Sequence, residues 1–234
     1  MYIGTSGFVY FVYKEWKEKF YPSELPSSKW LDYYVKFFNS LELNSTFYRI
    51  PKPSTVKSWK YKTKKYNLKI SIKVNKEITH KLPLSAKKAN EFLILFDELE
   101  EYIGAFLFQF PSSFNYDYKS LKNFIEGLNK NHKLAFEFRH KNWYNGKVFE
   151  LLSKNKISLV WHDFNQPFVM EKTAEFAYLR AHGFEGKYKG SYPDEFLEMF
   201  LKADFCYFNN TSDVSAVKDA LRLKDMAEKI KREE

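Results

Sequence analysis

The sequence has 234 residues, 44% of them hydrophobic and 29% charged, and its 38 basic against 29 acidic side chains give a formal net charge of +9. These proportions are those of a globular protein and exclude a disordered tail, a collagen-like fibre and, with a single cysteine, a disulfide scaffold. The apolar runs are far shorter than the roughly 20 residues of a membrane span and no secretion signal is visible, so we expect a cytoplasmic protein without a membrane partner.

Short runs rich in β-branched and aromatic residues predict eight strands along the chain. They cover Tyr2 to Thr5, Ser40 to Ser45, Lys69 to Lys73, Ala105 to Phe110, Leu134 to Phe138, Ser158 to His162, Phe176 to His182 and Asp204 to Phe208. Helical patterns lie between most of them. Their predicted starts or ranges are Ser28, Ser54, Ser85, Asp117, Lys147 to Asn155, Pro193 to Lys202 and Ser215 to Ile230.

The alternation of strands and helices predicts an α/β fold, a compact single-domain TIM-like (β/α)8 barrel over residues 1–234. No repeat or low-complexity linker divides the chain. The connection between strands six and seven, about Phe164 to Glu175, is too short and irregular for a full crossover helix. A doubly wound open sheet is the alternative fold.

Polar side chains collect where the predicted strands end, which is where barrel enzymes carry their chemistry. Strand side chains alternate between the two faces, so residues two positions apart point the same way. The pairs with this spacing are Glu42 with Asn44, Ser71 with Lys73, Glu137 with Arg139, and Arg180 with His182. We therefore expect these side chains to converge inside one end of the barrel.

Several short motifs occur together in a fixed order. They are Gly4-Thr5-Ser6-Gly7, Phe20-Tyr21-Pro22, Glu42 to Tyr48, Thr79-His80, Gln109-Phe110-Pro111, Glu137 to His140 with Trp143, Arg180 to Gly183, and Phe208-Asn209-Asn210. This series resembles that of the YecE-like family, domain of unknown function 72. The resemblance implies a TIM-like barrel and leaves the biochemical role open.

Only five of the 38 basic residues are arginine, and two of those lie at the ends of the fifth and seventh predicted strands. Together with Lys73, Arg139 and Arg180 suggest a small anionic ligand, because a guanidinium fork binds phosphate or carboxylate through paired hydrogen bonds. The candidate acid–base groups are Glu137, His182, Asp163 and Glu42. Further candidate substrate-binding residues are Asn44, Gln109, Tyr48, Asn209, Asn210, His80 and Trp143. We expect a hydrolase or lyase acting on an anionic, phosphorylated or nucleic-acid-derived compound.

Other interpretations of the same residues remain open. The charged groups are also consistent with a structural network of ion pairs, with a divalent metal site, or with paired carboxylates for glycoside hydrolysis between the aromatic walls Trp143, Trp161, Tyr48 and Tyr188. No metal ligand set or cofactor is predicted, since neither a phosphate-binding glycine loop nor a zinc-binding helix motif is present. The aromatic residues between Phe8 and Tyr21 are candidates for a lid or ligand wall.

A second class of function follows from the charge distribution. Residues 52–88 contain twelve lysines against the single acid Glu77. Such a block is typical of a solvated surface and also of a surface that binds nucleic acid through its backbone phosphates. A nucleic-acid-binding protein without catalysis is therefore the alternative function. The sequence does not indicate the oligomeric state.

Overall fold

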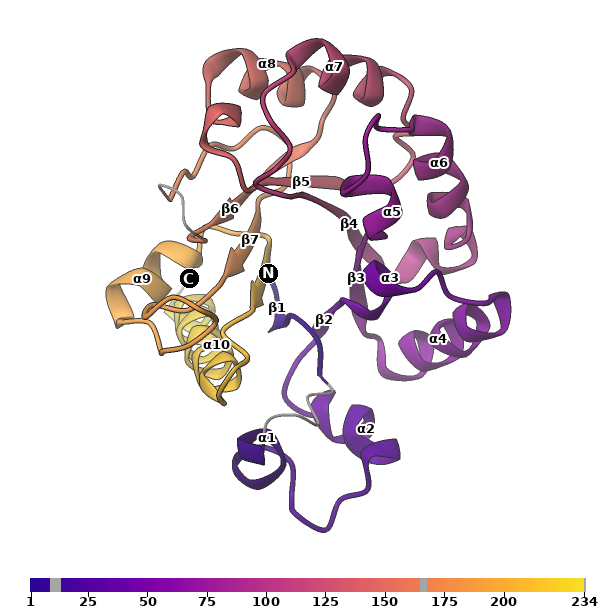
Figure 1. Ribbon diagram of the computed structural model, residues 1–234. Helices are drawn as coiled ribbons and strands as arrows, with labels where there is room; N and C mark the ends of the chain where they lie inside the picture. Colours follow the sequence, from indigo (N-terminus) through magenta and orange to yellow (C-terminus); the bar gives the residue numbers. More distant parts are fainter. Residues whose placement is uncertain (9–13, 165–167, 234) are drawn as a thin grey trace.

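The computed structural model describes residues 1–8, 14–164 and 168–233, and its eight parallel strands form one sheet in the order β1-β8-β7-β6-β5-β4-β3-β2. A parallel bridge between Ser6 and Glu42 joins the two outer strands, so the sheet curls into a barrel (Figure 1). The strands are β1 (Tyr2–Thr5), β2 (Ser40–Leu43), β3 (Lys69–Lys73), β4 (Ile103–Phe110), β5 (Leu134–Phe138), β6 (Ser158–His162), β7 (Tyr178–Ala181) and β8 (Phe205–Phe208). The predicted barrel is confirmed and the open sheet is not found.

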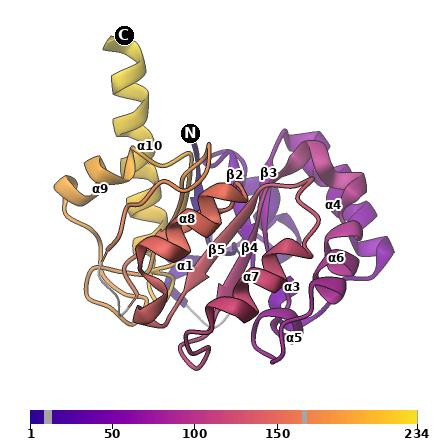
Figure 2. The same ribbon diagram turned by 90° about the horizontal axis from the view of Figure 1, so that it is seen from above.

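Helices surround the barrel on its outside (Figures 1 and 2). They are α1 (Lys14–Lys19), α2 (Trp30–Tyr34), α3 (Ser45–Tyr48), α4 (Pro53–Tyr66), α5 (Lys76–Thr79), α6 (Ala86–Ile94), α7 (Tyr118–Glu126), α8 (Gly146–Lys154), α9 (Asp194–Phe200) and α10 (Ser215–Glu233), with 3₁₀ turns η1 (Ser27–Lys29), η2 (Asp97–Tyr102) and η3 (Lys141–Trp143). The end of α10 projects beyond the barrel on the side of the N-terminus, away from α3 and α5 (Figure 2). No described helix has the length and apolarity that crossing a membrane requires.

Local sequence explains several helix starts. The side chains of Ser85 and Asp117 accept hydrogen bonds from backbone N–H groups of the first turns of α6 and α7, as predicted for N-caps. The start of α4 differs from the prediction. This helix begins at Pro53 rather than after Ser54, because proline at the first helical position needs no hydrogen bond from its nitrogen.

Two connections at the mouth can be compared with their predictions. β2 ends at Leu43, before the predicted end at Ser45, because Asn44 has helical backbone angles and precedes the short helix α3. Between β6 and β7 no helix occurs in residues 163–164 and 168–177, which confirms the predicted irregular connection.

The barrel interior follows the two-residue period of the strands. An inner apolar cluster fills the amino-terminal half and includes Leu107, Val160 and Tyr178, whereas a larger cluster packs between the sheet and the helices. Ser71 points inward and its hydroxyl lies 2.9 Å from that of Tyr207. The interior is therefore apolar toward the amino ends of the strands and polar toward their carboxyl ends, where the charged side chains lie.

Candidate active site at the barrel mouth

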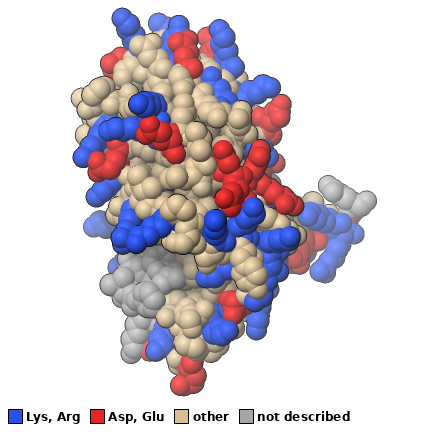
Figure 3. Space-filling view, turned by 90° about the vertical axis from the view of Figure 1, so that its right-hand side faces the viewer, with Lys and Arg blue, Asp and Glu red and all other residues tan. Residues whose placement is uncertain are grey.

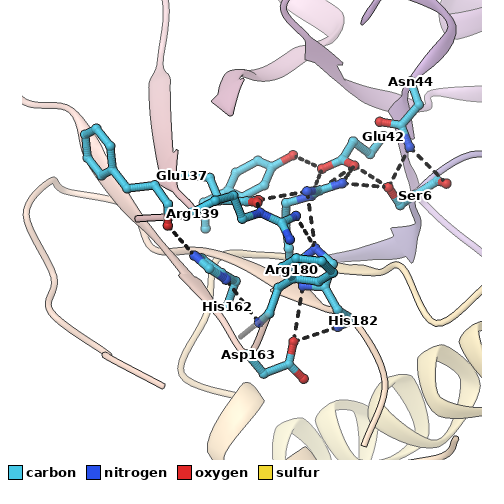
Figure 4. A network of polar contacts seen from close by, with 12 residues as sticks. Ser6, Glu42, Asn44, Glu137, Arg139, His162, Asp163, Arg180 and His182 are labelled. Atoms are coloured by element: carbon cyan, nitrogen blue, oxygen red, sulfur yellow. Dashed lines mark hydrogen bonds and ion pairs between the residues drawn. The ribbon is translucent and has the colours of Figure 1, made fainter. Parts of the chain in front are cut away.

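Arg180 of β7 is the centre of a buried polar network (Figure 4). Its Nε donates to both oxygens of Glu42, at 3.0 and 3.2 Å. Nη2 donates to Oε1 of Glu42 at 2.9 Å and to Oγ of Ser6 at 3.1 Å. Nη1 donates to Oε2 of Glu137 at 2.7 Å and lies 3.4 Å from Nε2 of His182. Every nitrogen of this guanidinium is thus engaged by the protein itself.

Glu42 of β2 is held from several sides. Its Oε2 accepts a hydrogen bond from the Tyr178 hydroxyl at 2.7 Å, and its Oε1 accepts one from Ser6. Asn44 donates to Oγ of Ser6 at 2.7 Å. Glu42 is fully buried, so these bonds and the ion pair with Arg180 replace the water that its carboxylate has lost.

Glu137 of β5 is clamped between two arginines. It forms ion pairs with Arg180 and, two residues along its own strand, with Arg139. Burial alone would raise the pKa of Glu137, but the two guanidinium groups outweigh it and hold the pKa well below its usual range. Glu137 is therefore a carboxylate at every physiological pH and has no proton to give as a general acid. Arg139 itself stacks 3.8 Å above the ring of Phe164.

His182 lies between a carboxylate, Asp163, and a guanidinium group, Arg139. Its Nδ1 is 3.2 Å from Oδ1 of Asp163, and its Nε2 is 2.9 Å from Nη2 of Arg139. Because arginine only donates, Nε2 is the acceptor and the imidazole is neutral with its proton on Nδ1. Burial, together with the charge of Arg139, lowers the pKa of His182 to about 3, although the hydrogen bond to Asp163 opposes this. Asp163 is fixed in turn by a hydrogen bond from the Tyr192 hydroxyl.

His162 of β6 is neutral as well. Its Nδ1 accepts a hydrogen bond from the backbone N–H of Phe164 at 3.2 Å, and its Nε2 lies 3.0 Å from the carbonyl oxygen of Phe138 and 2.6 Å from the Tyr144 hydroxyl. Burial lowers the pKa of His162. Neither mouth histidine in this arrangement is a base near neutral pH.

Lys73 differs from the other charged side chains at the mouth. Within the described part of the chain its Nζ has no hydrogen-bond partner and no carboxylate at ion-pair distance, and it lies 4.1 Å above the centre of the Phe47 ring. Burial and then the charge of Arg180 lower the pKa of Lys73 to about 7, against the opposing effect of Glu137 and Glu42. This amine changes its charge near neutral pH.

Two cavities open beside Lys73, with volumes of about 320 and 400 Å³. Lys73, Arg180, Tyr188 and Asn209 line both, so the cavities are two lobes of one depression at the mouth. Asn44 and Tyr48 belong to the first lobe, and Gln109, Arg139 and Phe164 to the second. The depression has room for a small ligand.

Three polar side chains in this depression carry no hydrogen bond of their own in the described structure: Gln109 of β4, Asn209 after β8, and Tyr188, whose ring packs on Phe164 and His182. The side chain of Gln109 is 8% exposed. Amides and hydroxyls left open beside a cavity are groups that a ligand can bind.

Two predicted ligand-binding residues, Trp143 and Asn210, do not line the depression. Trp143 is fully buried, donates its indole N–H to the carbonyl of Phe114 at 2.8 Å and stacks between Phe114 and Phe138. Asn210 is fully buried and donates to Asp219 of α10 at 2.8 Å. Both contribute to packing outside the barrel rather than to the mouth.

The predictions for the aromatic walls and for the first loop also differ from the structure. Trp161 is buried and donates to the carbonyl of Glu171, which leaves Tyr48 and Tyr188 as cavity walls. Trp16, Phe20 and Tyr21 are buried in the outer core and form no lid. The predicted lid residues 9–13 lie outside the described residues. His80 is exposed at the rim, 5.0 Å from the Phe47 ring.

The acidic side chains are not arranged as a metal site. Among residues 1–8, 14–164 and 168–233, no group of three His, Cys, Asp or Glu side chains is placed to hold an ion. Glu42 and Glu137 already bind the arginines, and Asp163 binds His182 and Tyr192. The same contacts occupy the carboxylates that glycoside hydrolysis would require.

The lysine-rich helix α4 faces solvent, with Lys57, Lys60, Lys62, Lys64 and Lys65 exposed. The acidic turn η2, with sequence Asp97-Glu98-Leu99-Glu100-Glu101, lies beside it, and Lys60 is 3.9 Å from Glu98. Figure 3 shows the resulting face, on which basic and acidic side chains adjoin. The basic block is therefore partly balanced by neighbouring acids.

Some site residues were missing from the sequence-based set. Tyr178 lies two residues before Arg180 on the same strand, so its inward direction was available from the alternation. Phe47 lies in the four-residue helix α3 and Tyr192 in a loop, and neither segment is long enough or regular enough for a period to indicate direction. Ser6 lies directly after β1, and only the closure of the barrel brings it to Glu42.

Fold and site together define a TIM-like (β/α)8 barrel protein with a polar depression at the carboxyl ends of its strands. The chain belongs to the family described as protein of unknown function DUF72, whose family model matches residues 2–234. The UPF0759 protein YecE of Escherichia coli K12 is 28% identical over 117 residues, which are 49% of this chain and 43% of that protein. The match thus spans less than half the length of this relative.

Solved structures agree on the fold. A DUF72 family protein of Thermotoga maritima MSB8 is 28% identical, with 97% of this chain and 98% of that chain covered at a TM-score of 0.80. A DUF72 family protein of Enterococcus faecalis V583 is 19% identical, with 97% and 95% covered at a TM-score of 0.75. The second likeness concerns the fold alone.

Proposed function

We propose that this protein is an enzyme that binds a small anionic substrate in the depression at the barrel mouth. The observation that carries this proposal is the ammonium of Lys73, which lines both lobes of the depression and has no ion-pair partner among the described residues. With a single, buried cysteine, we place the enzyme in the cytoplasm.

The charges around Lys73 favour binding of an anionic substrate. Arg139 and Arg180 contribute two positive charges, and Glu42 and Glu137 contribute two negative charges, so this group sums to zero. The remaining carboxylate of the mouth, Asp163, accepts hydrogen bonds from His182 and Tyr192. Among the described residues Lys73 therefore has no carboxylate at ion-pair distance. An anion beside it supplies the missing partner, while the amides of Gln109 and Asn209 and the Tyr188 hydroxyl offer hydrogen bonds.

We assign the acid–base role to Lys73 in place of the groups predicted from the sequence. Glu42 and Glu137 are tied to arginines, and His182 has a pKa of about 3. The pKa of Lys73, about 7, lies where a group both takes and gives protons under physiological conditions. Arg180 and Glu137 then position and balance the site, and the reaction class that we propose remains a hydrolase or lyase acting on an anionic compound.

Isothermal titration calorimetry with inorganic phosphate at pH 6.5 tests the proposal. We expect the wild type to bind and Lys73→Met to lose binding, with Lys57→Met on exposed α4 as the matched control that binds like the wild type. Equal binding by wild type and Lys73→Met, or no heat of binding for the wild type at millimolar phosphate, contradicts the proposal.

Binding of nucleic acid by α4 is the second candidate function. The exposed lysines on one helix favour it, since phosphate contacts by lysines are the main source of non-specific affinity. The acids of η2 beside this helix oppose it.

A further inference from the structure

We infer that Lys73 acts as a nucleophile, and that its amine condenses with the carbonyl group of a small anionic aldehyde or ketone to form an imine. This inference rests on the proposed function, because it specifies the substrate class of the same depression. It adds a covalent step that anion binding by itself does not require.

The position of Lys73 favours attack by its amine. It is the last residue of β3, and its Nζ rests on the Phe47 ring, where both lobes of the depression meet. Within the described structure the amine is not tied up in an ion pair, in contrast to the guanidinium groups of Arg139 and Arg180. Its lone pair is therefore directed to no other group once the proton is lost.

The surroundings of Lys73 also keep the amine unprotonated for part of the time. An amine attacks a carbonyl only in its neutral form, and lysines are activated for this by burial or by a neighbouring cation. Both conditions hold here, and together they lower the pKa of Lys73 to about 7. The exposed lysines of the chain lack this combination of burial and adjacent arginines.

The condensation needs no oxidant, reductant or cofactor. The amine nitrogen adds to the carbonyl carbon, and a proton moves from nitrogen to the former carbonyl oxygen, which gives a carbinolamine. The carbon–oxygen bond then breaks, the oxygen leaves as water with the second amine proton, and the carbon–nitrogen double bond forms. Tyr188, Gln109 and Asn209 line the depression and offer N–H and O–H groups to the departing oxygen.

The charge of the product fits the site. When the imine takes up a proton it becomes a cation at the position of the former ammonium. It then retains the positive charge that faces Glu42 and Glu137, and it pairs with the anionic group of the substrate. Such an iminium also withdraws electrons from the neighbouring carbon, as breakage of a carbon–carbon or carbon–oxygen bond by a lyase requires.

Reductive trapping tests the inference. The protein is incubated at pH 7.5 with pyruvate or glyceraldehyde 3-phosphate and sodium cyanoborohydride, digested, and mapped by mass spectrometry. We expect the stable secondary amine on Lys73 with at least one of the two compounds, well above the labelling of the other 32 of 33 lysines. Inorganic phosphate is expected to protect Lys73 by competing for the anion position.

Two comparisons separate this inference from the proposed function. Lys73→Arg keeps a positive charge but has no amine that forms an imine, so we expect it to bind phosphate without being labelled at the mouth. If the wild type binds phosphate while Lys73 is labelled no faster than Lys57, the imine is refuted and anion binding stands. If the wild type labels at Lys73 but phosphate neither binds nor protects, the anionic nature of the substrate is wrong. The wild-type map decides the inference even where a variant fails to fold.

Discussion

Lys73 is expected to destabilise the fold at neutral and acidic pH. Its pKa is lowered to about 7 in the folded protein, whereas in the unfolded chain it is near 10.4. Between these values the unfolded state binds the extra proton, so raising the pH from 7 to 10 stabilises the fold. One proton contributes at most about 1.4 kcal/mol per pH unit to the free energy of unfolding, and solvent contact of this half-buried side chain reduces the effect.

Lys73→Met is therefore expected to be more stable than the wild type at pH 6 to 7, with a difference that shrinks as the pH approaches 10. Urea denaturation at a series of pH values measures this. Lys57→Met, at an exposed position, is the control and is expected to follow the wild type. A parallel pH profile for wild type and Lys73→Met contradicts the burial of a free amine at the mouth.

Arg180 is expected to be a structural residue of the site. Its replacement by methionine leaves the buried carboxylates of Glu42 and Glu137 without their shared counterion. Removing one partner from a buried pair costs on the order of 3–5 kcal/mol of unfolding free energy. Arg232→Met, at a side chain that is 78% exposed, is the control and is expected to change stability by less than about 0.5 kcal/mol.

Guanidinium denaturation followed by circular dichroism checks the Arg180 prediction. If Arg180→Met is as stable as the wild type but has lost phosphate binding, this arginine binds the ligand and is not a structural residue.

The alternation of strand residues predicted which side chains face inward but not how their hydrogen bonds are distributed. Glu137 with Arg139 and Arg180 with His182 lie inward as the spacing indicates. The engagement of Arg180 by Glu42 and Ser6 depends on strands far apart in the chain, which meet only when the barrel closes. Lys73 is distinguished by having no ion-pair or hydrogen-bond partner in the described part of the chain, a property that no residue pattern contains.

At the level of elements, α4 and η2 decide how the lysine block behaves. Because the acids of η2 adjoin α4, we expect the protein to bind a DNA duplex weakly at 50 mM salt and to release it by about 200 mM, as phosphate contacts do. The variant with Lys57, Lys60, Lys64 and Lys65 changed to glutamate should elute from heparin at lower salt. The control carries the same charge change on α7 and α8, at Lys119, Lys122, Lys147 and Lys154.

If both variants elute from heparin at equally lowered salt, net charge alone explains the retention of the protein. A larger shift for the α4 variant, accompanied by loss of duplex binding in a fluorescence-anisotropy titration, supports a surface on this helix. Tight duplex binding that persists at 200 mM salt is the result that contradicts the weak affinity expected here.

At the scale of the whole molecule, the order of elements was predictable because each strand and helix carries a local signal. Hydrophobic runs located all eight strands, and the long, helix-containing connections between most of them required neighbouring strands to be parallel with helices outside. The barrel itself was predicted, but the joining of β1 to β2 through the isolated bridge between Ser6 and Glu42 was not predictable in this way. It depends on how tightly two backbones approach.

Gly4 permits that approach. A Cβ at this position would lie 2.0 Å from the carbonyl oxygen of Ser40, at the start of β2, and 2.9 Å from the Tyr34 hydroxyl. The backbone of β2 cannot move away without also disturbing the bridge between Ser6 and Glu42, and with it the carboxylate that binds Arg180. The seam of the barrel and the centre of the site therefore depend on the same close contact.

Gly4→Ala is expected to open this seam and to lower the unfolding free energy by more than about 2 kcal/mol, within the range of overpacked cores. Gly146→Ala is the matched control, since a Cβ there meets nothing within 4 Å and alanine restricts the unfolded chain, a change that stabilises by about 0.4–1 kcal/mol. Urea denaturation measures both, and hydrogen exchange of the β1 and β2 amides locates the effect. Faster exchange confined to these two strands in Gly4→Ala indicates a local opening of the barrel. Unchanged exchange and stability would mean that β1 and β2 are held together without this contact, and that the site does not depend on the seam.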